Sequence, residues 1–98
     1  MSSELETIKD TITRDKAYLA ETYGVKEIGI FGSVARGEAT ATSDIDMIVG
    51  FSKPIGLEFM SLAVYLEKIL GRKVDLMTRK SIRPAFQKYI LPTIIPII

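Results

Sequence analysis

Apolar residues recur along this chain at a helical spacing in three stretches, separated by shorter runs of a different period. The helical stretches cover, in order, residues 4–22, 55–70 and 82–90. Ser3–Glu6 has the form of a capping box at the start of the first stretch, and Gly24 and Gly71 are placed to end the first and the second. Ser81 is a candidate cap for the third, which tolerates Pro84 in its first turn.

Three short apolar runs predict strands over residues 26–31, 44–51 and 73–78. The first run ends at Gly32-Ser33, and the residues that follow favour one helical turn or more before Gly37. Residues 38–43 are small and polar, which indicates a loop. The order α-β-α-β-α-β-α predicts one α/β or α+β domain over residues 1–98, with helices packed against a small mixed sheet.

Length and composition limit what this domain does. Its 98 residues suffice for one modest core, and a net charge of +1 gives no electrostatic case for binding nucleic acid. The sequence has no cysteine and no histidine, which excludes disulfides, zinc sites with thiolate or imidazole ligands, and histidine general bases. Any metal ion must be bound by oxygen, which favours Mg²⁺ or Mn²⁺.

The two ends of the chain raise further expectations. The first residues include Glu4 and Asp10 where a secretory signal needs a basic start and an apolar run, so we expect a cytoplasmic protein with no membrane contact. The apolar residues 90–98 cannot form a regular helix, because Pro92 and Pro96 interrupt them. Two alternatives stay open for this tail: packing against the body of the domain, or a surface for self-association or another partner.

The junction after the first predicted strand is the first candidate site. A strand that ends in Gly32-Ser33 and leads into a helix can cradle a phosphate, because Gly32 lets the phosphate approach the backbone and Ser33 offers a hydroxyl. Arg36 follows three residues after Ser33, which returns its guanidinium to the same helix face. The alternative is an ordinary helix cap at a tight turn.

Two aspartates at the start of the second predicted strand form the second candidate. Asp44 and Asp46 are separated by about 6.5 Å along a strand, so both carboxylates face one side. Their repulsion is about 2–3 kcal/mol at an effective dielectric near ~20, and a divalent cation between them reverses its sign. The alternative is that Asp44 caps a turn while Asp46 lies on a solvated strand face.

Asp75 in the third predicted strand adds a third carboxylate if the two strands are neighbours. Three carboxylates opposite a phosphate cradle suit two-metal phosphoryl or nucleotidyl transfer. The alternative is an acid at a sheet edge. We interpret the nearby Arg72 as part of a solvated strand end, with approach to a triphosphate or pyrophosphate as the alternative. We interpret the tyrosines as packing or interface residues rather than nucleophiles.

In combination these residues resemble the minimal nucleotidyltransferases of the DNA polymerase β-like superfamily. The chain meets the family pattern G-S-x-x-R-G-x(n)-S-D-[IL]-D with Gly32, Ser33, Arg36, Gly37, Ser43, Asp44, Ile45 and Asp46. The later strand acid of the family corresponds to Asp75, and the likeness covers residues 25–89. It implies a nucleotidyltransferase fold like the polymerase β palm, and hence an enzyme.

The resemblance also implies a role for each residue. The catalytic and metal-binding residues would be Asp44, Asp46 and Asp75. The residues that bind or support the nucleotide would be Gly32, Ser33, Arg36 and Ser43. The aspartates would hold two Mg²⁺ ions, with Mn²⁺ as an alternative, and Asp75 would help to deprotonate the acceptor hydroxyl. Gly32 and Ser33 would hold the β- and γ-phosphates of ATP.

Substrate and partner follow from the same resemblance. Small stand-alone members of the family are commonly encoded beside a helical HEPN-domain RNase toxin, and act as its antitoxin by adenylylating a tyrosine. We therefore expect a protein adenylyltransferase that moves AMP from ATP to a hydroxyl of a HEPN-type partner, with no direct contact to nucleic acid. The alternatives are a non-catalytic antitoxin that masks its partner and a nucleotide-sensing regulatory subunit.

Overall fold

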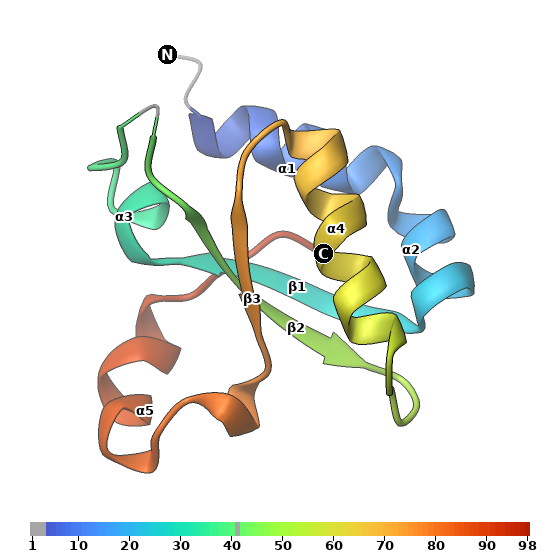
Figure 1. Cartoon of the computed structure of the whole chain (residues 1–98). Coiled ribbons are helices and arrows are strands. Elements are labelled where there is room, and N and C mark those ends of the chain that lie inside the picture. The colour runs from blue at the N-terminus through green and yellow to red at the C-terminus, as the bar shows by residue number, and fades with distance from the viewer. Residues whose placement is uncertain (1–3, 41) are drawn as a thin grey trace.

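Four strands form one mixed sheet in the part of the chain that the computed structural model describes, residues 4–40 and 42–98. The strands are β1 (Val25–Phe31), β2 (Ile45–Phe51), β3 (Val74–Met77) and β4 (Ile95–Pro96). Their order across the sheet is β3-β2-β1-β4. β1 runs antiparallel to both β2 and β4, whereas β2 and β3 are parallel (Figure 1). This arrangement confirms the mixed sheet expected from the sequence.

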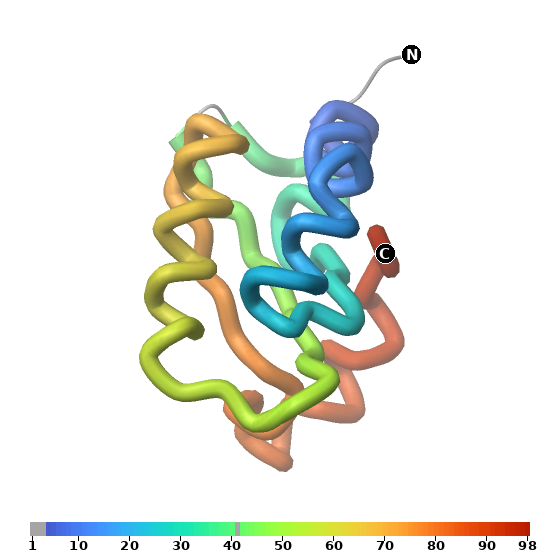
Figure 2. The backbone as a smooth tube through the Cα atoms, turned by 90° about the vertical axis from the view of Figure 1, so that its right-hand side faces the viewer, coloured from blue at the N-terminus to red at the C-terminus, as the bar shows by residue number. Residues whose placement is uncertain are grey.

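Three helices form a layer on one face of the sheet. They are α1 (Glu4–Arg14), α2 (Lys16–Tyr23) and α4 (Glu58–Leu70). α4 lies beside α1 and α2 (Figure 2). The two-residue period of β2 directs Ile45, Met47 and Val49 into this layer, where each is buried against helical side chains. The main core therefore lies between this layer and the sheet.

A smaller cluster lies on the opposite face of the sheet. Its buried members are Phe31, Ile48 and Ile82, and partly buried residues from the C-terminal part of the chain pack around them. The cover here comes mainly from residues on either side of the last helix, α5 (Pro84–Ile90), with Ile90 of the helix itself; α5 stands apart from the other helices at the lower left of Figure 1. Because Asp46 lies two residues before Ile48, its side chain is on this second face.

The first predicted helix is broken into two. Residues 4–22 do not form one continuous helix, because Asp15 separates α1 from α2 with a φ of −99° and a ψ of 10°. The Tyr65 hydroxyl of α4 donates a hydrogen bond to the Asp15 carboxylate at this break, which raises the pKa of Tyr65 to about 12. The predicted capping residue Ser3 lies outside the described residues. None of the described helices is long and apolar enough to cross a bilayer.

The last helix begins two residues later than the sequence indicates. Ser81 does not cap it; the Ser81 side chain instead bonds the backbone of Thr78 and closes a single 3₁₀ turn, η1 (Arg79–Ser81). α5 then starts at Pro84, whose missing N–H costs nothing in a first turn. The predicted strand 44–51 is also shorter by one residue, so Asp44 precedes β2.

The apolar tail packs against the body of the domain, the first of its two alternatives. After the 3₁₀ turn η2 (Leu91–Thr93), β4 pairs with β1, and the Ile97 N–H donates to the Ile28 carbonyl at 2.8 Å. Ile97 is 8% exposed and belongs to the main core, while Ile94 packs into the smaller cluster. Self-association through this tail stays a prediction, with less apolar surface available than the sequence indicates.

We expect Ile97→Ala to destabilise the domain by about 2–4 kcal/mol, because it removes a buried side chain and leaves a cavity under β4. Val64→Ala on the outer face of α4 is the matched control and should change the free energy of unfolding by less than about 0.5 kcal/mol. Urea denaturation of the two variants measures both. An equal, small effect would contradict the packing of the tail into the core.

Candidate active site

The register of the sheet aligns three positions across neighbouring strands. Phe31, the last residue of β1, pairs with Asp46 of β2, and Asp46 pairs with Asp75 of β3. Paired residues on adjacent strands project to the same face, so the carboxylates of Asp46 and Asp75 share the face opposite the three-helix layer. The condition that the sequence left open, that the two strands are neighbours, is therefore met.

Gly32 brings the backbone against the Asp46 carboxylate. Its φ of +74° turns the chain sharply from β1 into α3 (Gly32–Ala35). A Cβ placed at Gly32 would lie 2.1 Å from the Asp46 Oδ2, so a larger residue would displace the Asp46 carboxylate. The sharp turn and the close approach together require glycine at this position.

The electrostatics of Asp46 show that the acidic residues are neighbours. Its pKa is raised, first because partial burial disfavours the carboxylate, and then because the charges of Asp75 and Asp44 repel it. The guanidinium of Arg36 acts in the opposite direction. Asp44 and Asp75 are themselves exposed. The structure therefore brings the three predicted aspartates and Arg36 into one electrostatic group.

This donor set has the chemistry of a site for a hard divalent cation, because carboxylate oxygens are the ligands that Mg²⁺ prefers. As they stand, no three acidic side chains within residues 4–40 and 42–98 are close enough together to hold one ion. The mutual repulsion of carboxylates disfavours their close approach when no cation lies between them. The chemistry of the three aspartates thus fits a divalent ion, and their side chains would have to approach one another to bind it.

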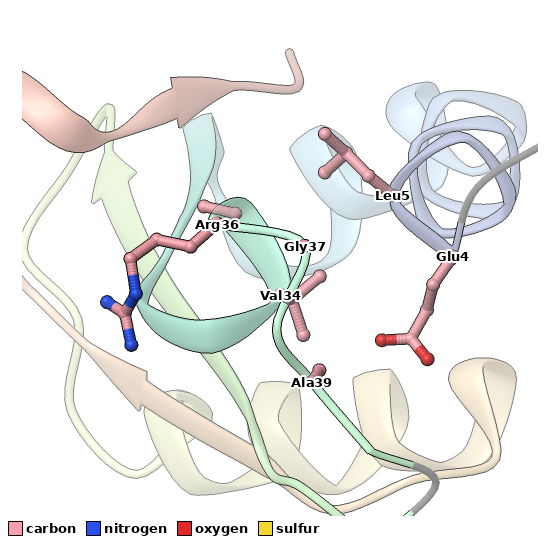
Figure 3. A pocket seen from close by; sticks show the side chains of 7 residues that line it. Glu4, Leu5, Val34, Arg36, Gly37 and Ala39 are labelled. Carbon is pink, nitrogen blue, oxygen red and sulfur yellow. The ribbon is translucent and has the colours of Figure 1, made fainter.

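The one-turn helix α3 is anchored on one side and open on the other. Val34 is buried in the main core, whereas Ser33 is half-buried. Arg36 is exposed, and its Nε lies 2.8 Å from Glu38 Oε1. In Figure 3 the Arg36 side chain points away from the hollow of about 350 Å³ that Glu4, Leu5 and Ala39 line. Arg36 contributes to the lining of this hollow, and the three aspartates do not.

Ser43 closes the turn that leads into β2. Its hydroxyl accepts a hydrogen bond from the Thr40 N–H at 2.9 Å and lies 3.1 Å from the Thr40 hydroxyl. The Ser43 N–H in turn donates to the Thr40 carbonyl at 3.1 Å. These contacts agree with a supporting role for Ser43 in the loop; its predicted part in nucleotide binding stays a prediction.

Arg72 corrects one interpretation of the sequence. Its side chain is 18% exposed rather than solvated, and Nη2 donates to the carbonyls of Ser43 at 2.5 Å and Thr40 at 3.2 Å. Nη1 lies 2.6 Å from Glu4 Oε2 of α1. The available signal was topological: parallel strands begin at the same edge of a sheet, so a residue just before β3 lies near the residues just before β2.

Comparison with known proteins assigns this arrangement to a family. The sequence profile of the nucleotidyltransferase domain matches residues 12–95. The chain belongs to the nucleotidyltransferase family. It is 42% identical over 92 residues to protein adenylyltransferase MntA of Thermococcus cleftensis, and the match covers 93% of each chain. The enzyme class and family expected from the motif are therefore confirmed.

Two solved structures support the same assignment. A provisionally assigned minimal nucleotidyltransferase matches this nucleotidyltransferase with a TM-score of 0.73 at 33% identity, over 91% of this chain and 94% of the other. A toxin–antitoxin crystallised with AMP-PNP matches with a TM-score of 0.59 at 26% identity, over 74% of this chain and 58% of the other.

We expect Gly32→Ala to destabilise the nucleotidyltransferase more than Gly37→Ala. Both glycines have a positive φ, +74° and +73°, so each alanine incurs a conformational penalty of about 1–2 kcal/mol. A Cβ at Gly37 meets nothing within 4 Å, whereas one at Gly32 meets the Asp46 carboxylate. Urea denaturation should show the larger loss for Gly32→Ala. Equal losses would contradict the contact between Gly32 and Asp46.

We expect Asp46→Asn to raise the melting temperature at pH 7 and low ionic strength. Because the pKa of Asp46 is higher in the folded protein than its ordinary value of 3.8, ionisation destabilises the fold at neutral pH, and this penalty disappears as the pH falls below that value. The gain should therefore shrink when melting is measured toward pH ~3.5. Asp10→Asn, on the exposed face of α1, serves as control. A pH-independent effect would contradict the interpretation.

Proposed function

We propose that this nucleotidyltransferase transfers AMP from ATP to a hydroxyl group of a partner protein, using two divalent ions, and that it acts as an antitoxin toward a HEPN-type RNase toxin. The observation that carries the proposal is the alignment of Asp46 with Asp75 beside Gly32. The relationship to an enzyme named protein adenylyltransferase supports the acceptor class. The relationship to a toxin–antitoxin crystallised with AMP-PNP supports the adenine nucleotide and the antitoxin role.

In this proposal the three aspartates are the protein ligands of the metal. Asp44 and Asp46 would hold both divalent ions, and Asp75 would hold one of them and help to deprotonate the acceptor hydroxyl. Two Mg²⁺ ions, or Mn²⁺ in their place, stabilise the charge on the attacking and the leaving oxygens when bound. A cation also removes the mutual repulsion that raises the pKa of Asp46. Asp75 is exposed, so its carboxylate can accept the proton of an incoming hydroxyl.

The turn after β1 holds the polyphosphate. The N–H groups of a first helical turn lack partners within the helix, so those of α3 can donate to phosphate oxygens, and the Ser33 hydroxyl adds a further donor. The acceptor oxygen bonds to the α-phosphorus as the bond from that phosphorus to the bridging oxygen breaks, and pyrophosphate leaves. Arg36 contributes positive charge beside Asp46. Its ion pair with Glu38 restricts the conformations of the Arg36 side chain. Ser43 holds the loop that precedes Asp44.

A second candidate is an antitoxin that masks its partner without modifying it. The observation in its favour is a line of exposed apolar side chains along α4 and the residue before it: Leu57 is 84% exposed, Met60 69% and Val64 65%. Their spacing of three and four residues places them on one helix face. Such a face suits a protein partner, whether or not catalysis follows binding. A nucleotide-sensing subunit would bind ATP without releasing pyrophosphate.

We expect label transfer to the neighbour-encoded protein from ATP labelled at the α-phosphate, and none from ATP labelled at the γ-phosphate. Asp44→Asn, Asp46→Asn and Asp75→Asn should each reduce transfer by about 10²-fold or more, because each removes a carboxylate from the metal site. Asp10→Asn is the matched acidic control and should retain activity.

Three outcomes would each contradict a different part of the proposed function. Transfer from the γ-phosphate would assign phosphoryl rather than nucleotidyl transfer. Undiminished transfer by the three site variants would remove the aspartates from the mechanism. Full protection of cells by a protein with both Asp44→Asn and Asp46→Asn would favour masking over modification.

A further inference from the structure

One arginine joins three segments of the chain next to the candidate active site. Arg72 stands between α4 and β3, and its guanidinium reaches the carbonyls of Thr40 and Ser43 and the Glu4 carboxylate of α1. The partners in the loop lie 32 and 29 residues away in sequence. This is a long-range attachment of a surface loop to the body of the domain.

The turn of this loop is closed by local hydrogen bonds among its described residues. Thr40 and Ser43 bond each other through backbone and side chain, and the Thr40 hydroxyl lies 3.3 Å from that of Thr42. Such local bonds fix the shape of a turn but not its place on the protein. Ala39 packs against the main core before the turn, and the bonds from Arg72 attach the turn itself.

Asp44 is held from both sides by two consecutive residues. Arg72 binds the carbonyl of Ser43, just before Asp44, and the carbonyl of Lys73 accepts the N–H of Ile45, just after it, at 3.0 Å. Asp75 follows two residues later on the same strand. The start of β3 therefore sets the backbone of Asp44 relative to Asp75.

The two carbonyl bonds explain why this residue is an arginine better than the ion pair with Glu4 does. The buried Nε of Arg72 has no hydrogen-bond partner among the described residues, and an orphaned buried donor costs about 1–3 kcal/mol. A lysine could pair with Glu4 without that cost. A lysine has no planar fork, however, and cannot reach the carboxylate with one nitrogen and two carbonyls with another.

We propose that Arg72 is a positioning residue that fixes Ser43 and Asp44 so that the Asp44 carboxylate faces the divalent-ion site. This inference rests on the proposed function, since it gives Asp44 an ion to bind. Arg72 contacts neither substrate nor metal; it acts through the backbone before Asp44. Loss of its two carbonyl bonds frees the loop and weakens metal binding while leaving the fold intact.

The test compares Arg72→Lys with two matched controls. Glu4→Gln removes the ion pair and leaves the carbonyl bonds, and Arg79→Lys alters a similar ion pair, 2.7 Å from Glu27, elsewhere on the sheet. In the metal-free proteins, amide hydrogen exchange at residues 42–45 should be faster by about 10-fold or more in Arg72→Lys alone, with the amides of β1 unchanged. Mn²⁺ affinity, measured by electron paramagnetic resonance, should fall about 10-fold in Arg72→Lys and stay within about twofold in the controls.

Each outcome of these measurements supports or overturns the inference about Arg72. Unchanged exchange at residues 42–45 in Arg72→Lys would overturn the inference, and so would faster exchange with unchanged Mn²⁺ affinity. An equal loss of Mn²⁺ affinity in Glu4→Gln would assign the effect to the ion pair instead. Failure of the wild-type protein to bind Mn²⁺ would overturn the proposed function itself. If the wild-type protein binds Mn²⁺ and Arg72→Lys binds it equally well, the inference about Arg72 is overturned and the proposed function is not.

Discussion

The position of β2 between β1 and β3 is the constraint on which the site depends. On one face of β2, Ile45, Met47 and Val49 are almost completely buried under the helices. Since side chains alternate along a strand, a slip of one residue would move the Asp46 carboxylate into that core. The hydrophobic packing of one face therefore fixes the acidic residues on the other, and the fold tolerates their repulsion because the register cannot relax.

The sequence was most informative where the signal is local. The alternation in β2 predicted which face carries Asp46, and the glycine–serine pair predicted the turn after β1. Strand pairing was less accessible, because the pairing of Asp46 with Asp75 depends on which strands become neighbours. Arg72 was missed because its partners in the loop are backbone carbonyls, which every residue type has. The break at Asp15 was missed because its partner, Tyr65, is 50 residues away.

The two faces of the sheet have different surroundings. The aspartates lie on the face that the smaller cluster covers in part, whereas the exposed apolar side chains of α4 lie on the outside of the helical layer. Under the proposed function, a partner bound on α4 would leave the aspartates uncovered, and β3 is the edge strand on that side of the sheet. Partner docking and the chemistry would then use separate surfaces.

The pairing of β4 with β1 has a consequence for synthesis in the cell. The edge of β1 at Gly29 and Ile30 is completed by Ile95 and Pro96, which the ribosome makes more than 60 residues later. Until those residues emerge, the nascent chain exposes an unprotected strand edge rich in isoleucine, the kind of surface that chaperones recognise. The edge of β1 is therefore covered only after the acidic strand β2 and its neighbour β3 have been made.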